Sequence, residues 1–578
     1  MEMREVKQPE KGAIVNRAAR LGLVIGRVLQ VIALVLVVAA GMPNSVAAGE
    51  AGDELVRQAL RDRIVALRNN GELRPAGGEI AARRLIPEFY AIRDYAPVWS
   101  NPDRRRALLR AVDDSASHGL DPSDYQFDLL RTLADDGVRD AGRLADRDLL
   151  FTEALLRLVY HLRFGKVDPR ELYEGWNFSR SLGAVEPVQA LEALVRAEPL
   201  GPAIELYAPR LEAYRQLRAA LLAYRAMEVL GGWPSVPAGA TLRAGDRDPR
   251  VPILRERLKA SGDHLQPPPH DRELFDEALR ESVVAFQARH GLEPDGAVGR
   301  RTFAALHVDV RRRIDQIRVN LERLRWIAQD VAGDYLLVNI AGFNARLYLD
   351  GKLAWQSRVV VGRPYRKTPA FRAEMQYLVL NPEWVIPPTI LKEDVLPKVA
   401  RESGYLREHD MRVVTNAGKD VDQREVDWTR YREGGFPYQI VQAAGPDNPL
   451  GRIKFMLPNP YSVYLHDTPT KKLFERSERA FSSGCIRLER PMELAVLLLD
   501  DPVQWTAEAL EGEIAKGETR NVQIGRRVPV MILYHTAEVG EDGRTYFHPD
   551  LYDQDTAVLE ALGRPFRFGA VGRSRSAK

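Results

Sequence analysis

The sequence predicts a multidomain α+β protein, and three observations carry that prediction. The chain has 578 residues, more than one hydrophobic core usually holds, so three or four domains are expected. Apolar residues spaced by three and four run from about Glu54 to Tyr224 and predict an N-terminal all-α domain over residues 50–230. After about residue 330 the pattern alternates, which predicts a mainly β domain over residues 330–540.

The N-terminus has the pattern of an export signal. Basic residues precede an uncharged stretch, residues 28–49, whose apolar centre is VIALVLVVAAG. The small residues Val46 and Ala48 fit cleavage after Ala48. An uncleaved segment of this length would instead span a bilayer with its positive flank inside. Residues 1–48 are therefore expected to be a signal peptide or a membrane anchor, with the rest of the chain outside the cytoplasm.

Charge gives no support to nucleic-acid binding. The formal net charge is only +3, although the residues after Arg564 are locally basic and could touch an anionic surface or form a solvated end. The chain has one cysteine, Cys485, so it cannot form an internal disulfide, and an exported thiol without a partner is either a buried filler or a reactive group.

The helical domain shows no cluster of catalytic residue types, so a supporting role is expected. Turn signals in HGLDPSDY (118–125) and FGKVDPREL (164–172) separate its helices. His118 and His161 are its metal-ligand candidates, but neither has a second ligand nearby in the sequence, so both are expected to be structural histidines.

A Gly- and Pro-rich linker (230–246) opens a second unit, residues 240–308, that reads as amphipathic helices. Its segments AFQARHGL (285–292) and DGAVGRRTFAAL (295–306) resemble the small three-helix peptidoglycan-binding module of cell-wall enzymes. An insertion at 264–274 is longer than that module usually has. The positions that carry the resemblance are Phe286, Gln287, Gly291, Leu292, Asp295, Gly296, Gly299, Thr302 and Leu306.

The β domain begins with hairpins in residues 334–363, with turn signals at Ala341 and Gly342 and at Asp350 and Gly351. Further strands are expected in AEMQYLVLNP, IVQAAG, KFMLP, YSVYLHD and RRVPVMILYHTAEV. A strand-poor insert at about 390–436 is expected to be either a lid or a passive elaboration. Residues 541–578 are expected to form a C-terminal extension outside the catalytic domain.

The run FSSGCIRLERP (481–491) is where a thiol nucleophile is expected. Ser482, Ser483 and Gly484 allow a tight bend that brings amide groups near a substrate carbonyl. A thiol with an ordinary pKa needs a base, and His466, nineteen positions earlier at the end of the strand-like YSVYL, is that candidate. Two neighbouring strand ends would bring the two side chains together.

Supporting roles follow from the same run. The turn Ser483, Gly484, Cys485 would supply an oxyanion hole, with the Cys485 N–H as its main donor. Asp467 could orient His466, but on a strand its side chain would point away, so its backbone carbonyl is the better candidate. Arg487 alternates in register with Cys485 and suits a substrate carboxylate, unless it forms a structural salt bridge. No metal site is expected.

The block from Gln442 to Pro491 closely resembles the catalytic core of L,D-transpeptidases. The resemblance is to the large Gram-negative branch, which has a helical scaffold domain, a binding module and an inserted lid. Cys485 matches its acylated nucleophile, His466 its base, and Ser482, Gly484 and Arg487 the rest of the signature. Many members carry histidine where this chain has Ser483, and the large branch often carries serine there.

The resemblance implies a periplasmic enzyme that forms 3→3 peptidoglycan cross-links through a cysteine thioester with a tetrapeptide stem, releasing D-alanine. It implies peptidoglycan stem peptides as partners, with no metal or organic cofactor. Water as acceptor would give an L,D-carboxypeptidase, and a lipoprotein lysine would give a wall-anchoring enzyme. The non-enzymatic alternative is an inactive wall-binding scaffold, against which the presence of both Cys485 and His466 argues.

Overall fold

The computed structural model describes residues 44–135, 137–181, 185–264, 266–267, 269–402, 404–431, 435–566 and 568, with side chains from residue 52 on. Most of the expected export signal and of the basic C-terminal tail lies outside these residues. In the part that is described, no helix combines the length and the apolarity that crossing a bilayer requires.

The described residues form two compact units. The first holds residues up to Leu109 with Asp128–Leu155 and Glu186–Arg196, and the second holds Arg110–Phe127, Leu156–Val185 and the residues from Ala197 on. The helical region expected as one domain over 50–230 is thus divided between the two units. Its helices are α2 (Asn44–Asn70), α3 (Leu85–Ile92), α4 (Pro102–Asp114), α5 (Phe127–Leu133), α6 (Ala141–Phe164), α7 (Pro187–Arg196), α8 (Leu200–Glu205) and α9 (Glu212–Val229).

The first unit is organised around a buried carboxylate. Asp148 accepts hydrogen bonds from the Tyr90 hydroxyl at 2.6 Å and from the amides of Val98 (3.0 Å) and Trp99 (2.7 Å). Because buried polar groups must be bonded, this cluster fixes the loop after α3 against α6.

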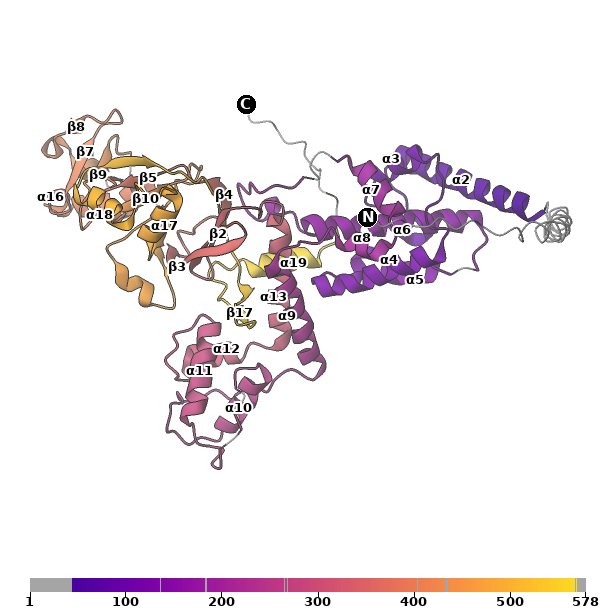
Figure 1. Ribbon diagram of the computed structural model, residues 1–578, viewed down its shortest axis with the longest axis horizontal. Coiled ribbons are helices and arrows are strands. Elements are labelled where there is room, and N and C mark those ends of the chain that lie inside the picture. The colour runs from indigo at the N-terminus through magenta and orange to yellow at the C-terminus, as the bar shows by residue number, and fades with distance from the viewer. Residues whose placement is uncertain are drawn as a thin grey trace, which may run out of the picture. The chain divides into compact units, whose positions relative to one another are not determined.

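The module has helices α10 (Val251–Ala260), α11 (Glu277–Arg289) and α12 (Arg300–Leu306), which Figure 1 draws as one helical group. Gln287 explains several of the sequence positions noted above. Its buried amide donates to Asp295 at 2.8 Å and to Thr302 at 3.1 Å, and its oxygen accepts from Gly296 N at 2.8 Å. Gly296 has φ +76°, and a Cβ there would lie 2.7 Å from the Arg280 side chain, so only glycine fits.

The β domain is built on one large mixed sheet with the order β14-β5-β10-β11-β13-β3-β2-β1-β15-β4, and β12 pairs with β3. The two-residue turn expected at Asp350 and Gly351 is confirmed, since both have positive φ between β2 and β3. The strands are β1 (Tyr335–Asn339), β2 (Asn344–Leu349), β3 (Lys352–Gly362), β4 (Phe371–Glu374), β5 (Tyr377–Leu380), β10 (Ile453–Met456), β11 (Leu465–His466), β12 (Ala480–Ser482), β13 (Ile486–Leu488), β14 (Arg520–Gln523) and β15 (Pro529–Leu533).

The core of this domain joins the sheet to helices α17 (Pro491–Leu499) and α18 (Ala507–Ala515). Alternate apolar residues of the strands fill it, as period-two patterning requires. The expected mainly β catalytic domain with helical domains before it is therefore confirmed as the fold class.

The insert between β5 and β10 differs from the expectation of a strand-poor segment. It has its own sheet, β6-β9-β7-β8, and IVQAAG contributes β9 to that sheet rather than to the large one. Short strands with charged neighbours hid this pattern in the sequence. The elements are β6 (Trp384–Val385), α14 (Pro388–Ile390), a π-helical turn (Leu391–Val395), α15 (Leu396–Val399), α16 (Tyr405–Glu408), β7 (Met411–Val414), β8 (Asp420–Val421) and β9 (Gln439–Gln442).

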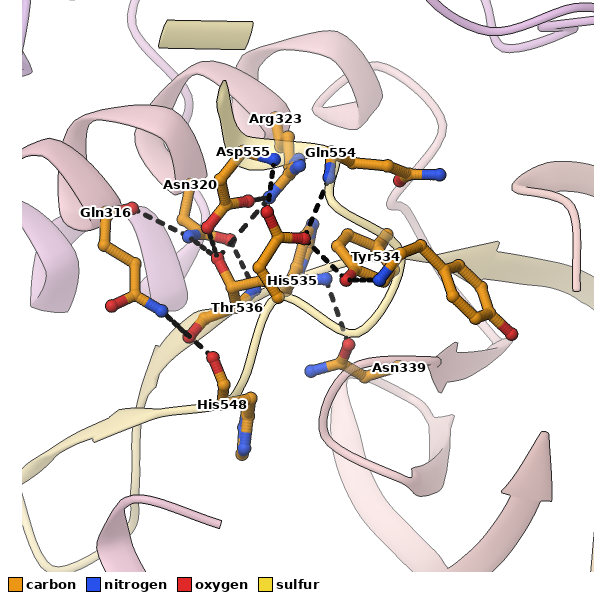
Figure 2. A network of polar contacts seen from close by, with 12 residues as sticks. Gln316, Asn320, Arg323, Asn339, Tyr534, His535, Thr536, His548, Gln554 and Asp555 are labelled. Carbon is orange, nitrogen blue, oxygen red and sulfur yellow. Dashed lines mark hydrogen bonds and ion pairs between the residues drawn. The ribbon is translucent and has the colours of Figure 1, made fainter. Parts of the chain in front are cut away.

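The C-terminal residues also correct the sequence analysis, because the boundary expected at 541 falls inside a hairpin. Strands β16 (Ala537–Val539) and β17 (Thr545–Phe547) pair across it, and α19 (Asp555–Gly563) follows. Figure 2 shows how helix α13 (Val310–Ile327) holds this segment: Asn320 donates to the Thr536 hydroxyl at 2.8 Å, and Arg323 forms an ion pair with Asp555 at 2.5 Å.

Candidate active site

The predicted nucleophile and base lie at neighbouring strand ends. Strands β11 and β13 pair in parallel, with His466 opposite Arg487, and β10 pairs with β11 so that Lys454 is opposite His466. Register partners share a face of a sheet, and residues two apart share it as well. Tyr464 and Cys485, each two positions before a register partner, therefore join Lys454, His466 and Arg487 on one face.

The turn before Cys485 is held by its own side chains. Gly484 has φ +119°, a conformation that residues with a Cβ rarely adopt. Ser482 Oγ accepts a hydrogen bond from Gly484 N at 3.1 Å and donates to Cys485 O at 2.5 Å. The Gly484 amide is therefore engaged, whereas no acceptor among the described residues bonds the Cys485 N–H. Among the expected oxyanion donors, the Gly484 amide is thus excluded and the Cys485 amide remains available.

Ser483 is exposed and faces the insert instead of the sheet. Its Oγ accepts a hydrogen bond from Arg366 Nη1 at 2.9 Å. The same guanidinium forms ion pairs with Glu393 at 2.6 Å and Asp394 at 2.5 Å, both in the π-helical turn of the insert. Arg366 thus connects the turn of residues 483–485, called the nucleophile turn below after the predicted role of Cys485, to the inserted subdomain. The sequence analysis did not identify it, because nothing in RPYRKTP shows that it lies near Cys485.

His466 is buried and held in one tautomer. Its Nδ1 lies 2.5 Å from the carbonyl oxygen of Asp467, so Nδ1 carries the proton and donates it. Burial, followed by the charge of Arg487, lowers the pKa of His466 to about 3. The imidazole is therefore neutral at physiological pH, with its lone pair on Nε2.

The Asp467 carboxylate faces away from the imidazole, as strand alternation suggests. It accepts hydrogen bonds from Arg452 N at 2.9 Å and from Lys471 Nζ at 2.6 Å. Gly451, with φ +61°, makes room for it, since a Cβ there would lie 2.5 Å from a carboxylate oxygen. Asp467 therefore supports the strand end through its side chain and His466 through its backbone.

Cys485 is half-buried, and its Sγ lies 3.8 Å from the carbonyl oxygen of Ser462. Burial raises the pKa of the Cys485 thiol, while hydrogen bonds from Tyr464 and the charges of Lys454 and Arg487 oppose that rise. A raised thiol pKa beside a lowered histidine pKa describes a neutral thiol and a neutral imidazole. Both groups therefore rest uncharged, so ionisation of the thiol has to accompany its attack on a substrate.

Two cations on this face lack an anionic partner. Among the described residues neither Arg487 nor Lys454 forms an ion pair, so the salt bridge considered for Arg487 is absent there. Arg487 Nε is buried without a hydrogen-bond acceptor, and Lys454 Nζ lies 3.9 Å from the centre of the Tyr464 ring. Burial lowers the pKa of both side chains. Their unpaired charge is complementary to a carboxylate ligand.

Lys454 and Tyr464 were missed in the sequence analysis, although a signal was present. Tyr464 precedes His466 by two residues on a strand, which places both side chains on one face. Lys454 was harder to find, because only the pairing of β10 with β11 brings it opposite His466.

Away from this face, His118 has neighbours that its sequence surroundings did not show. Asp114, His118 and Glu205 offer ligand atoms within 4.8 Å of one another. Arg218 pairs with Asp114 at 3.6 Å and with Glu205 at 2.5 Å, and His118 Nδ1 is 3.0 Å from the Tyr214 hydroxyl. The acids are therefore neutralised by an arginine, and the cluster is an ion-pair network. His161 is likewise bonded to the Tyr125 hydroxyl at 2.9 Å.

Three parts of the chain match known families of protein domains. Residues 333–522 match the family of L,D-transpeptidase catalytic domains, also called YkuD domains. This range includes every residue of the face described above. Residues 84–221 match the family of scaffold domains, and residues 247–306 match the family "Putative peptidoglycan binding domain".

A Haemophilus influenzae protein named "Putative L,D-transpeptidase" is 37% identical over 243 residues, which are 42% of this chain. The match spans about half the length of that relative, 48%. Among solved structures, an L,D-transpeptidase from Mycobacterium smegmatis is 14% identical with a TM-score of 0.18, covering 35% of this chain and 59% of its own. An L,D-transpeptidase from Xylanimonas cellulosilytica is 13% identical with a TM-score of 0.16, covering 51% and 99%.

Residues 333–522 of this chain are therefore a domain of the YkuD-type L,D-transpeptidase catalytic family. Together with the matches to a scaffold domain and a peptidoglycan-binding domain, this is the combination of domains that the resemblance to the large branch predicts.

Proposed function

We propose that this protein is an L,D-transpeptidase that forms 3→3 cross-links between peptidoglycan stem peptides through a thioester on Cys485. The observation that carries the proposal is that His466 ends β11 and Cys485 directly precedes its parallel partner β13, so both lie on one face, with Nδ1 of a neutral imidazole fixed by Asp467 O. The unpaired charges of Arg487 and Lys454 support an anionic peptide as substrate.

In the first half-reaction, Cys485 Sγ attacks the carbonyl between the third and fourth residues of a tetrapeptide stem. His466 Nε2 accepts the thiol proton and returns it to the amide nitrogen as the C–N bond breaks, so D-alanine leaves as a neutral amine. The Cys485 N–H donates to the oxyanion that forms on the carbonyl oxygen. The product is a tripeptide thioester.

In the second half-reaction, the side-chain amine of a second stem attacks the thioester. His466 accepts the proton of the amine, the C–S bond breaks, and the cross-link forms with the thiol restored. Arg487 is suited to a substrate carboxylate, which a guanidinium binds through two parallel hydrogen bonds. Charge, protons and atoms balance with the residues of this face alone.

The acceptor distinguishes this proposal from its enzymatic alternatives. Water in place of the amine gives an L,D-carboxypeptidase, and a lipoprotein lysine gives an anchoring transpeptidase. Arg366, which contacts both Ser483 and the insert, supports a role for the insert in shaping the acceptor side and hence in acting as a lid. We also propose export to the periplasm, with residues 1–48 as signal or inner-membrane anchor, because the substrate lies there.

The test is incubation of the purified protein with tetrapeptide muropeptides, followed by mass spectrometry. Cross-linked dimers with loss of D-alanine are expected, and clean conversion to tripeptide would replace transpeptidation by carboxypeptidase activity. Cys485→Ala is expected to abolish both products and acylation by a carbapenem while leaving sacculus binding intact. Persistent acylation of that variant would exclude Cys485 as the nucleophile. His409→Gln, at an exposed histidine of the insert, is the control for His466→Gln.

A further inference from the structure

The C-terminal segment reaches the catalytic domain through Tyr552, between β17 and α19. Its side chain is buried at 2% exposure within the core of the catalytic domain. The ring stacks on Tyr534 with 5.4 Å between ring centres and 15° between planes, and its backbone N donates to the Tyr534 hydroxyl at 2.8 Å. Tyr552 is therefore fixed in position by contacts that do not involve its own hydroxyl.

The Tyr552 hydroxyl clamps the loop that follows β3. It donates a hydrogen bond to Gly362 O at 2.7 Å and accepts one from Thr368 N at 3.1 Å. Lys367 Nζ in the same loop donates to the Tyr552 carbonyl at 2.9 Å. Both ends of residues 362–368 are thus attached to one tyrosine.

Thr368 transmits this position to the nucleophile turn. Its buried Oγ1 accepts a hydrogen bond from Gly362 N at 2.9 Å and donates one to Gly484 O at 2.7 Å. The chain of contacts therefore runs from Tyr552 through Thr368 to the carbonyl of the residue before Cys485. Apart from Gly484, these residues stood outside the site predicted from sequence.

The carbonyl of Gly484 and the N–H of Cys485 belong to one peptide unit. A trans peptide is planar, so its C=O and its N–H point in opposite directions. When Thr368 holds Gly484 O, it also fixes the direction of the Cys485 N–H. That N–H is the oxyanion donor of the proposed function, and this inference rests on that role.

We propose that Tyr552 and Thr368 are positioning residues that aim the Cys485 N–H at the oxyanion, so that the segment after residue 541 is part of the catalytic apparatus. Neither side chain has to touch the substrate for this. Preorganised donors act because they are already directed at the place where charge develops. A loop that is free to rotate the Gly484 peptide would lose that advantage while leaving the thiol in place.

Two small reagents distinguish a misdirected Cys485 N–H from a general loss of reactivity at Cys485. p-Nitrophenyl acetate acylates Cys485: sulfur attacks the ester carbonyl, an oxyanion forms, p-nitrophenolate leaves, and the thiol proton goes to His466 or water. Iodoacetamide alkylates the same sulfur at a saturated carbon and expels iodide, so no oxyanion forms. Donor misalignment therefore slows the first reaction and leaves the second unchanged.

The variants are Thr368→Val, which removes the hydrogen bond to Gly484 but keeps the shape, and Tyr552→Phe, which keeps the stacked ring. Acylation is expected to fall about 10²-fold in Thr368→Val, the lower end of the effect of losing an oxyanion donor. The acylation rate is expected to fall about tenfold in Tyr552→Phe, because Tyr552 is one hydrogen bond further from the Gly484 peptide than Thr368 is. Thr368→Ser is expected to restore the wild-type rate to within about threefold.

The control is Tyr546→Phe, which removes a tyrosine hydroxyl of the same segment that bonds Asp542 at 3.2 Å on the β16–β17 hairpin. Its acylation rate should equal that of the wild type. The proposal is overturned if Thr368→Val and Tyr552→Phe acylate normally, or if acylation and alkylation fall by the same factor. Because these reagents bypass peptide recognition, the result is independent of the muropeptide assay, whose failure would count against the proposed function alone.

Discussion

Helix α13 and the proposed catalytic face, which carries Lys454, Tyr464, His466, Cys485 and Arg487, both hold cations with reduced access to water, but the cations have opposite surroundings. On α13, Arg325 and Glu322 form an ion pair at 2.6 Å with both side chains fully buried. Arg325 also donates to the Tyr214 hydroxyl and to His118 O, each at 2.9 Å. On the catalytic face, Arg487 and Lys454 have no anion in the described part of the chain.

The difference indicates what each cation is for. A buried charge is costly unless it is paired, so a fully paired one fixes the fold and an unpaired one lowers its stability. Two unpaired cations near a thiol lower the stability of the fold. We expect such a loss of stability to be kept only where a ligand supplies the missing negative charge. The paired cations should therefore matter for folding, and the unpaired ones for activity. Four experiments test this contrast.

The largest effect is expected for Glu322→Gln, which leaves Arg325 buried without its counter-charge. Breaking a buried ion pair from one side typically costs about 3–5 kcal/mol of unfolding free energy. Urea denaturation of the purified variant measures it. The control is Glu228→Gln, which removes the partner of the exposed Arg311, and a loss below about 1 kcal/mol is expected. Equal losses in the two variants would contradict the contrast.

Arg487→Met should show the opposite pattern. Removing the substrate's carboxylate partner is expected to lower kcat/KM with tetrapeptide about 10²-fold, or ~2.7 kcal/mol. The unfolding free energy should stay level or rise, since a partly buried charge without an ion-pair partner among the described residues is removed. Release of D-alanine and urea denaturation, measured on the same preparation, provide both values. A large loss of stability would make Arg487 a structural residue.

Lys454→Met is expected to have a smaller effect of about tenfold on kcat/KM, or ~1.4 kcal/mol, because Lys454 acts on the thiol partly across the Tyr464 ring. Lys454→Arg keeps the charge and should recover most of the rate. Failure of arginine to recover it would show that the size of the side chain, rather than its charge, is required.

The smallest effect concerns pH. Burial raises the pKa of Cys485, so the rate of alkylation by iodoacetamide should keep rising as pH passes the ordinary thiol range. The positive charge of Arg487 favours the thiolate, and its removal in Arg487→Met should move the inflection to higher pH. His466, with its pKa lowered to about 3, should add no inflection between pH 5 and 7. An inflection there would show that it is charged.

Much of this arrangement was predictable from sequence, and the reasons are local. Cys485, His466, Gly484 and Arg487 lie in two short runs, and the expectation that two neighbouring strand ends bring these runs together is confirmed by the pairing of β11 with β13. Strand alternation also predicted that Asp467 would orient His466 through its backbone. For His118 the sequence analysis considered only residues nearby in the chain. It therefore missed Glu205, which contacts His118 from a helix far along the sequence.

What the sequence did not reveal depends on contacts between distant segments. Lys454 becomes part of the face only when β10 pairs with β11, and Arg366 only when the loop after β3 meets the nucleophile turn. Tyr552 lies 67 positions after Cys485 and shows no motif of its own. The insert concealed its strands because they are short, and two of them have only two residues each.

The point at which the insert leaves the large sheet has a consequence for how such a protein tolerates change. The chain departs after Leu380 and returns at Ile453, and these two residues are direct partners in antiparallel β5 and β10. Topologically, the whole subdomain is the turn of a β-hairpin enlarged to some seventy residues. Since the closure entropy of a loop grows only slowly with its length, this turn could be shortened, lengthened or exchanged while the catalytic strands keep their register.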